Sequence, residues 1–232
     1  MPHAGCRQIA NTFNRQHAGK GESVGKTYVA NLAKRRALTI LSLRRKLKNR
    51  ATKAGPRNLT WAADLTFLPD SSPVLGILDH GTRALITFRA MRTRTTIAIL
   101  RVVLDAVEAF GAPRFFRTDN EPVFTSPVFT LALRLLGIRH QRTDRFCPWQ
   151  NGRIERVFWT LKEKVVRWWT EAGVPADAQP DLDIVRAWYN HVRTHQGLAG
   201  RTPFESWSPS ARGPLRFFST WNGLLAGFGR ST

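Results

Sequence analysis

Three carboxylates, Asp64, Asp119 and Glu155, are the residues of this sequence best suited to chemistry. Acids are scarce, because the chain of 232 residues has 36 Lys and Arg but only 16 Asp and Glu. Asp64 lies within an apolar run, where a lone charge would be costly to bury. Asp119 follows a second apolar run, and 35 residues separate it from Glu155. Carboxylates that met in the fold from three distant places would repel one another unless a cation neutralised them.

The chemistry that such a group of acids supports is metal-assisted phosphoryl transfer. Hard carboxylate oxygens select Mg²⁺ or Mn²⁺. Two such ions, about 4 Å apart, can activate an attacking oxygen and stabilise a leaving oxygen at phosphorus. Taken singly, each acid has an ordinary structural interpretation: Asp64 as a charge at a strand edge, Asp119 as a turn or cap residue, and Glu155 as an exposed helix residue. The neighbouring sequence has to decide between the two interpretations.

The sequence from residue 59 onward predicts alternating strands and helices that would position these acids. Residues 61–68 are apolar on both faces, as is typical of a buried central strand, and 74–78 and 84–88 follow as neighbouring strands. The later elements are expected at 97–110 (helix), 114–118 (strand), 128–136 (helix), 138–143 (strand), 151–169 (helix) and 182–192 (helix). Asp119 then falls at the end of a strand, where open α/β sheets present functional groups. This order predicts an α/β fold with a mixed sheet flanked by helices.

The residues around the three acids carry a resemblance to a known family. The segments are Trp61-Ala-Ala-Asp64-Leu-Thr, Arg117-Thr-Asp119-Asn120 and Pro148-Trp-Gln-Asn151-Gly152-Arg-Ile-Glu155-Arg. Together they resemble the integrase-core (DDE) family, which includes bacterial insertion-sequence transposases and retroviral integrases. The closing segments Trp188-Tyr189-Asn190-His-Val-Arg193-Thr-His195-Gln and Arg201-Thr-Pro203-Phe204 resemble the end of the core of the bacterial members. The resemblance covers roughly residues 59–207.

This resemblance implies an RNase H-like fold and a DNA transposase or integrase. Asp64, Asp119 and Glu155 would be its catalytic and metal-binding residues, holding two Mg²⁺ or Mn²⁺ ions. The reaction would be metal-dependent cleavage at the 3′ end of an element followed by strand transfer. Partners would be element ends and target DNA, with no small-molecule substrate and no membrane. A homo-multimer on DNA, in the cytoplasm of a bacterium and associated with its nucleoid, is expected.

Three features depart from parts of that family. The retroviral branch has an N-terminal His-His-Cys-Cys zinc module, and here His3 and His17 bracket Cys6 with no second cysteine nearby. Glu121 stands where much of the family has glycine, and the sequence leaves open whether it affects the metal site or points outward. Cys147 stands where an aromatic residue is frequent. None of these departures removes a catalytic ligand, and the first favours the bacterial branch.

The charge of the chain points to a polyanionic partner, with nucleic acid the leading candidate. The formal net charge is +20 at pH 7. Residues 1–58 hold 14 Lys and Arg and one acid, whereas 59–232 hold 22 and 15. We therefore divide the chain into a basic helical module (1–50), a linker (51–58), a catalytic core (59–207) and a loosely packed C-terminal tail (208–232).

The basic module is expected to be a small helix-turn-helix-like DNA-binding module. Ile9, Ala10 and Phe13 recur at helical spacing, a loop is expected over 14–22, and Ser23 is a candidate N-cap for a second helix. One face of that second helix could lie in a DNA groove, and its residues are Lys26, Thr27, Asn31, Lys34 and Arg35. A third helix over 36–50 would contact phosphates through Arg44, Arg45, Lys46, Lys48 and Arg50. Solvated helix faces are the alternative for both.

Further DNA contacts are expected around Glu155. Asn151 and Lys162 share its helix face, and Arg153 and Arg156 lie on neighbouring faces, although a helix cap and solvated side chains would explain them equally well. We interpret His140 as structural, and the pair His191 and His195, expected at i and i+4 of one helix, as organising a helix end rather than binding zinc. The simplest roles for the remaining aromatic residues are core or dimer contacts, with stacking on unpaired bases as the alternative; these residues are Trp159, Trp168 and Trp169.

Several classes are excluded or left as alternatives. No run of about 18 apolar residues exists, which excludes a membrane span, and the N-terminus does not read as a secretory signal. The two cysteines, Cys6 and Cys147, are too far apart in sequence to form a disulfide framework or a paired-cysteine zinc site. Two alternative functions remain: a catalytically inactive DNA-binding derivative, and an RNase H-like nuclease that only hydrolyses.

Overall fold

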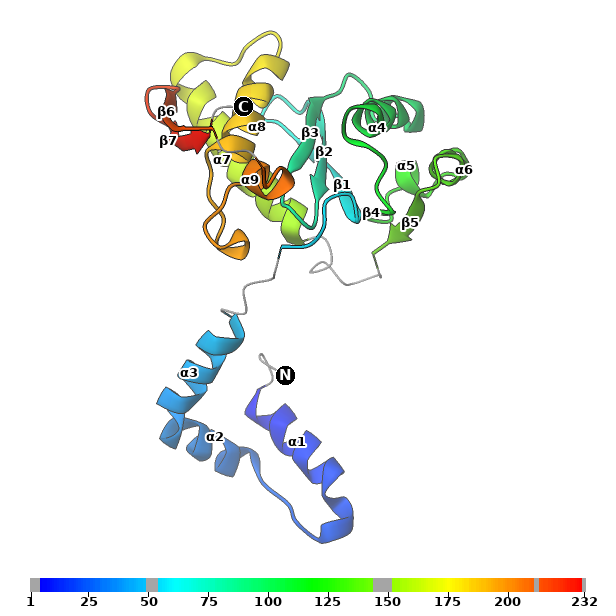
Figure 1. Ribbon diagram of the computed structural model, residues 1–232. Coiled ribbons are helices and arrows are strands. Elements are labelled where there is room, and N and C mark those ends of the chain that lie inside the picture. The colour runs from blue at the N-terminus through cyan, green and yellow to red at the C-terminus, as the bar shows by residue number, and fades with distance from the viewer. Residues whose placement is uncertain (1–4, 49–53, 144–151, 211–212, 231–232) are drawn as a thin grey trace. The chain divides into compact units, whose positions relative to one another are not determined.

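The computed structural model describes residues 5–48, 54–143, 152–210 and 213–230 (Figure 1). The chain forms two units, residues 1–51 and 52–232, each held together by its own contacts. In the parts of the chain that are described, none of the helices combines the length and the apolar character needed to cross a bilayer.

The second unit is built on a five-stranded mixed sheet with strand order β3-β2-β1-β4-β5. The strands are β1 (Thr60–Phe67), β2 (Pro73–Asp79), β3 (Leu85–Ala90), β4 (Phe115–Thr118) and β5 (Arg139–Arg142). The first three are antiparallel neighbours, whereas β4 pairs parallel to β1 and β5 parallel to β4. The mixed sheet expected from the sequence is therefore confirmed, and β1 lies at its centre.

Helices cover both faces of this sheet (Figure 1). They are α4 (Thr96–Phe110), α5 (Pro122–Thr125), α6 (Pro127–Leu135), α7 (Gly152–Ala172), α8 (Gln179–His191) and α9 (Pro203–Trp207), with a short 3-10 turn, η3 (Gln196–Leu198). Trp61, Ile77 and Phe116 of the sheet share one core with α4 and α6, and Leu78 and Phe88 share the other with α7 and α8. Alternation along β1 puts Trp61, Ala63 and Leu65 in the first core, so Asp64 faces the side of α7.

The approach of α7 to the sheet depends on a glycine. Gly76 of β2 pairs directly with Asp64 of β1. A side chain at Gly76 would overlap the ring of Phe158, which lies on α7. The missing Cβ therefore lets α7 lie close to the strand that carries Asp64.

Side-chain caps mark the start of α4 and of α6. The Thr95 hydroxyl accepts a hydrogen bond from the backbone N–H of Ala98 at the start of α4, and the Ser126 hydroxyl accepts one from Phe129 at the start of α6. Such caps satisfy amides that have no partner within the helix. Local sequence therefore fixes where these two helices begin.

The C-terminal segment is better ordered than its sequence predicts, and the expectation of a loosely packed tail is wrong for residues 215–230. β6 (Leu215–Thr220) and β7 (Leu225–Arg230) form an antiparallel hairpin. Trp221 and Leu225 are buried in the same core as α7 and α8, and the Trp221 ring stacks on Trp168 with centroids 5.4 Å apart. The short, glycine-rich segment gave no clear period, and burial against a distant helix is what orders it.

The first unit is helical: α1 (Cys6–Gln16), a 3-10 turn η1 (Ala18–Lys20), α2 (Lys26–Arg35) and α3 (Ala37–Lys48). Two boundaries differ from expectation, since α1 continues through Gln16 and α2 is preceded by Gly25 rather than capped by Ser23. The Asn14 side chain fixes the connection between α1 and α2. Its amide accepts from the Val24 N–H at 2.7 Å and donates to the Val24 carbonyl at 3.1 Å, so one side chain closes the loop before α2.

Candidate active site

Asp64 is held in the middle of the sheet and is half-buried. Its Oδ1 accepts a hydrogen bond of 2.9 Å from the backbone N–H of Leu65. Strand β1 supplies this position because the residues before and after Asp64 are buried and apolar, and they anchor the strand in the core that it shares with α4 and α6. Asp64 is therefore a carboxylate placed rigidly next to α7.

Asp119 follows β4 directly and lies beside Asp64. Ala62 of β1 pairs in parallel register with Arg117 of β4, so two residues further on each chain brings Asp64 and Asp119 to neighbouring positions. The Asp119 Oδ1 accepts a hydrogen bond of 3.1 Å from the Glu121 N–H. The parallel pair of strands thus brings together two acids that are far apart in sequence.

Glu155 reaches the same region from α7. The helix packs its apolar face on the sheet, with Ile154, Val157 and Phe158 buried, and leaves Glu155 exposed. The charge of Glu155 raises the pKa of Asp64, which places its carboxylate within electrostatic reach of the sheet acids. The three acids named by the sequence analysis therefore come from three elements toward one region.

Burial and like charges together set the electrostatics of this region. Burial first, and then the charges of Asp119, Glu121 and Glu155, raise the pKa of Asp64 to about 7, against the lowering effect of the Leu65 N–H. Burial and Asp119 also raise the pKa of Glu121, whereas Arg94 lowers it. Glu121, whose direction the sequence left open, is thus a fourth acid acting on Asp64.

The fit of this group to a metal ion has two sides. Its donors are carboxylate oxygens, and the charges of Asp119, Glu121 and Glu155 raise the pKa of Asp64. Carboxylates gathered in this way are typical of a site for a hard divalent cation. The described side chains nevertheless contain no set of three or more His, Cys, Asp or Glu placed closely enough to hold an ion. The carboxylate oxygens are the right donors for Mg²⁺. In this structure, however, the described acids do not come close enough together to coordinate one ion.

Arg153, which the sequence predicts to contact DNA, makes a hydrogen bond within the protein. Its Nη1 donates a hydrogen bond of 2.9 Å to the backbone carbonyl of His80, in the turn after β2. Burial, together with the charges of Arg83 and Arg117, lowers the pKa of Arg153 to about 10. The guanidinium thus ties the first turn of α7 to the sheet, two residues before Glu155.

The other expected contacts of α7 are placed as follows. Arg156 is exposed and Lys162 is half-buried. Asn151 lies outside the described residues. Trp169 is buried and Trp168 is packed, but 68% of Trp159 is exposed, so a core role is wrong for this residue.

The histidines have packing roles in the structure. His140 of β5 hydrogen bonds to the Thr118 hydroxyl at 2.9 Å and packs on Phe129. The expected placement of His191 and His195 on one helix is wrong, because α8 ends at His191. Their rings contact different partners, Phe204 for His191 and Tyr189 for His195, which fits the structural interpretation.

The helical unit presents polar faces on α1 and α2. The five residues expected to contact DNA from α2 are all exposed: Lys26, Thr27, Asn31, Lys34 and Arg35. The side chains of residues 43–48, including those expected to contact phosphates, are outside the described set.

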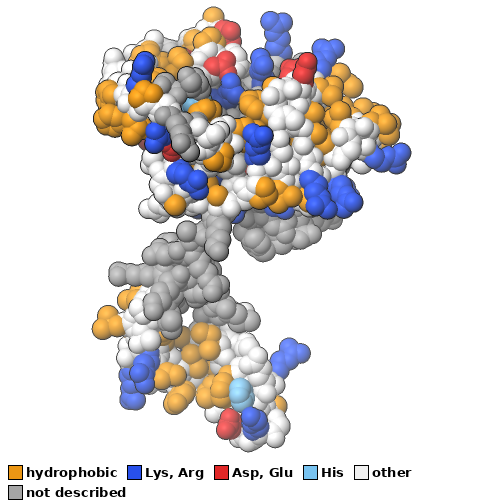
Figure 2. All heavy atoms as spheres, viewed as in Figure 1, with side chains coloured by type: hydrophobic (Ala, Val, Ile, Leu, Met, Phe, Trp, Pro, Cys, Tyr) orange, Lys and Arg blue, Asp and Glu red, His pale blue; other side chains and the backbone are white. Residues whose placement is uncertain are grey.

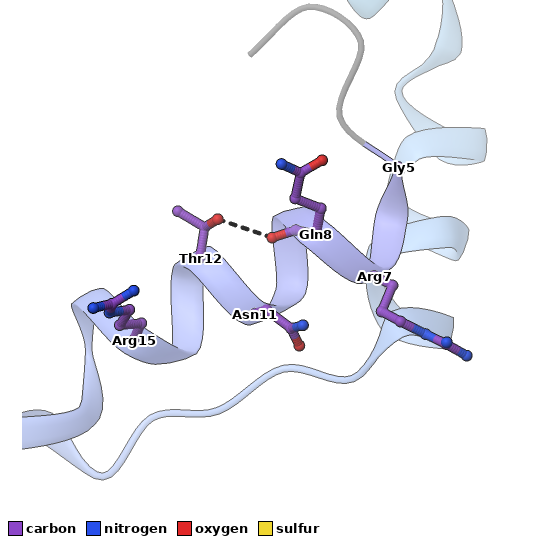
Figure 3. A pocket seen from close by; sticks show the side chains of 6 residues that line it. All are labelled: Gly5, Arg7, Gln8, Asn11, Thr12 and Arg15. Atoms are coloured by element: carbon purple, nitrogen blue, oxygen red, sulfur yellow. Dashed lines mark hydrogen bonds between the residues drawn. The ribbon is translucent and has the colours of Figure 1, made fainter.

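Sequence reasoning missed the polar face of α1. An open hollow of about 460 Å³ is lined there (Figure 3) by Gly5, Arg7, Gln8, Asn11, Thr12 and Arg15. The helical spacing of Arg7, Asn11 and Arg15, opposite the apolar Ile9 and Phe13, is the signal that could have identified it. Arg, Gln and Asn are the side chains that most often read base edges.

Figure 2 shows where charge gathers on the surface. Lys and Arg side chains are spread over the visible face of the second unit, with few acids among them. This distribution follows from the excess of basic residues in the sequence. It is the surface expected of a protein that binds a polyanion.

Comparison with known proteins gives three results. A family model described as "Integrase core domain" matches residues 136–203. A protein of insertion element IS476 from Xanthomonas euvesicatoria is 29% identical over 152 residues, 63% of this chain and 43% of the relative. The transposase for insertion sequence element IS904 from Lactococcus lactis is 24% identical over 168 residues, 68% of this chain and 64% of the relative. The chain thus spans less than two thirds of the length of either relative.

Solved structures share the fold. The catalytic core domain of HTLV-2 integrase, solved in complex with magnesium, superposes with a TM-score of 0.56 at 17% identity. The match covers 67% of this chain and 99% of that domain. The five-stranded sheet with its flanking helices is therefore the architecture of a retroviral integrase catalytic core.

Proposed function

We propose that the chain is a DNA transposase of the insertion-sequence branch of the integrase-core family, which the family-model match and the two insertion-element relatives support. It cleaves DNA at the 3′ end of an element and transfers the freed strand to target DNA. The observation that carries this proposal is the parallel register of β1 and β4, which brings the half-buried Asp64 and Asp119 to neighbouring positions beside the half-buried Glu121. In so basic a chain, acids at the surface can pair with neighbouring cations. A half-buried group of acids costs free energy and has no such structural explanation.

Asp64, Asp119 and Glu155 are the residues proposed to hold two Mg²⁺ or Mn²⁺ ions. The oxygen donors support this assignment, as does the magnesium complex of the HTLV-2 integrase core. When bound, divalent cations supply charge stabilisation to the attacking and leaving oxygens at phosphorus.

The proposed reaction needs positioning more than covalent chemistry. Water attacks the phosphodiester at the element end, one P–O bond forms as another breaks, and a strand with a free 3′-hydroxyl leaves. That hydroxyl then attacks a target phosphodiester, and the displaced target strand leaves with its own 3′-hydroxyl. The exposed Arg156 and the half-buried Lys162 hold backbone phosphate beside Glu155, with Asn151 as a further contact. No covalent enzyme intermediate is required.

The helical unit is proposed to be the DNA-binding module, of helix-turn-helix type. The exposed polar face of α2 would lie in a groove through Lys26, Thr27, Asn31, Lys34 and Arg35. The polar face of α1 adds Arg7, Gln8 and Asn11 as candidate base-reading side chains. The linker 51–58 would join this module to the core.

The substrates of the reaction suggest the oligomeric state of the protein and its place in the cell. Joining two element ends to one target requires more than one active site near the DNA, so we propose a homo-multimer on DNA. The activity is assigned to the bacterial cytoplasm, at the nucleoid, where such substrates lie.

A strand-transfer assay tests the proposal. Labelled DNA carrying an element end is incubated with the protein, a target plasmid and Mg²⁺. Labelled plasmid is the expected product, and it should be absent when EDTA replaces Mg²⁺. Cut ends without joining would support the hydrolytic nuclease, and binding without cutting would support the inactive DNA-binding derivative.

A further inference from the structure

Trp159 is exposed in a way that the other described tryptophans are not. Of its surface, 68% is open to solvent, whereas Trp61, Trp169, Trp188 and Trp221 are at most 8% exposed. The other two have ring partners: Trp168 stacks on Trp221, and Trp207 packs edge-on against Phe110. An indole left in water forfeits a large burial energy, so its place on the surface indicates a partner.

The position of Trp159 relates it to the candidate active site. It lies four residues after Glu155 on α7, and therefore one turn further along the same helix face. Arg156 is exposed three residues before it, and Lys162 is half-buried three residues after it. The indole thus stands between two cations, one helical turn from a proposed catalytic acid.

This combination of groups fits a single-stranded nucleic acid. A base presents a flat apolar face that an indole can stack on, and its backbone presents the negative charge that the flanking cations attract. We propose that Trp159 is a stacking platform for an unpaired base of the DNA strand that enters the active site. The inference rests on the proposed DNA transposase function and adds to it a residue that positions the strand.

Charge also favours DNA over a second copy of the chain as the partner of the Trp159 surface. Each copy carries a net charge of +20, and pairing two Trp159 faces would bring the flanking Arg156 side chains of both copies together. Such like-charge contacts are unfavourable. DNA neutralises these cations, so it is the occupant that the surface favours.

The test measures binding of the full-length protein to two fluorescent probes. The first is a single-stranded 20-mer of thymidine, and the second is the same strand with abasic sites in place of the bases. Stacking on one base corresponds to an affinity change of about tenfold. We expect Trp159→Leu to weaken binding to the thymidine strand by about tenfold, and Trp159→Phe to retain most of the affinity. On the abasic strand, wild type and Trp159→Leu should bind alike.

Phe217→Leu is the matched control. Phe217 is 63% exposed and lies on β6 of the same unit, so it tests whether any exposed aromatic residue has the same effect. This substitution should leave binding to both probes unchanged. Because Trp159 is exposed, Trp159→Leu should also unfold at the temperature of the wild type, which separates lost stacking from lost folding.

Two outcomes would overturn the inference. Equal binding of the thymidine strand by wild type and Trp159→Leu would exclude stacking. Unchanged DNA binding together with a shift from multimer to monomer, followed by light scattering, would identify the face as a contact between copies. The binding test does not depend on catalysis, so absent strand transfer with a clear Trp159 effect would contradict only the proposed function. Normal strand transfer with no Trp159 effect would contradict only the inference.

Discussion

At the scale of single residues, Asp64 is defined by its surroundings. The carboxylate is half-buried in a sheet, and the acids nearest to it in electrostatic terms are Asp119, Glu121 and Glu155. Such a group lowers the stability of the protein until a cation binds it. In the metal-free state, the acids that form the site therefore lower the stability of the fold.

Asp64→Asn should affect activity and stability in opposite directions. It should abolish cutting and joining while leaving DNA binding intact, because it removes a metal ligand and no surface cation. In EDTA the variant should melt a few degrees above the wild type, since it removes one of several repelling charges. Adding Mg²⁺ should raise the melting temperature of the wild type more than that of the variant. Joining at the wild-type rate would contradict the assignment of this residue.

A half-buried histidine makes the stability of the protein sensitive to acid. Partial burial, together with the charges of Arg193 and Arg83, lowers the pKa of His195 to about 4. In the unfolded chain the same group has its ordinary pKa of about 6.5. The stability contribution is therefore complete above pH 6.5 and is lost as the pH falls toward 4, because the unfolded state then binds the proton first.

The measurement is urea unfolding of wild type and His195→Gln between pH 7 and pH 4.5. Wild type should lose about 1 kcal/mol per pH unit from this group in the lower part of that range. The variant should show a shallower dependence. Identical slopes for the two proteins would contradict a lowered pKa of His195 in the folded state.

At the scale of elements, the placement of α7 decides whether the acids can act together. Its first turn is tied to the β2–β3 turn by the hydrogen bond from Arg153 to the His80 carbonyl. Its middle is set by Phe158 lying over Gly76. Two contacts at different points of the helix thus fix Glu155 relative to the sheet.

Arg153→Met should test this role against direct DNA contact. Losing the tie to His80 should lower the rate of joining by about ten- to a hundredfold, as is typical when a residue that orients a ligand is removed. DNA affinity and its salt dependence should change little. Arg156→Met is the comparison, because it is exposed on the same turn and should weaken binding instead. A similar loss of affinity in both variants would mean that Arg153 contacts DNA.

Several of these elements follow from the sequence, and others do not. The acids Asp64 and Asp119 could be placed because apolar runs predict strands directly. The side chain of Arg153 could not, because its partner is a backbone carbonyl about seventy residues away, and no local pattern marks such a contact. The β6–β7 hairpin was missed for the same reason, since Trp221 is ordered by Trp168. Local signals predict elements, while packing between distant elements decides burial.

At the scale of the whole molecule, charge should govern binding to DNA. The net charge of +20 is shared by both units, and the visible surface of the second unit shows few acids among its cations. Binding through phosphate contacts releases counterions from the DNA. Affinity should therefore depend strongly on salt.

Salt titration checks this expectation. The logarithm of the association constant should fall linearly with the logarithm of the salt concentration. Replacing Lys26 and Lys34 together by Met should reduce that slope by about two, since each phosphate contact contributes about one. Asn31→Ala should instead leave the slope unchanged. Binding that does not respond to salt would contradict a phosphate-dominated interface.

The Asn14 clamp has a practical consequence. One amide bonds to both the N–H and the carbonyl of Val24, so the ends of the intervening loop are joined by a side chain rather than by the loop itself. Lengthening a closed loop costs little entropy, and residues 19–22 of this loop are exposed. A fluorescent label or an affinity tag inserted there should leave the pairing of α1 and α2 intact, giving a handle for following the protein on its substrate.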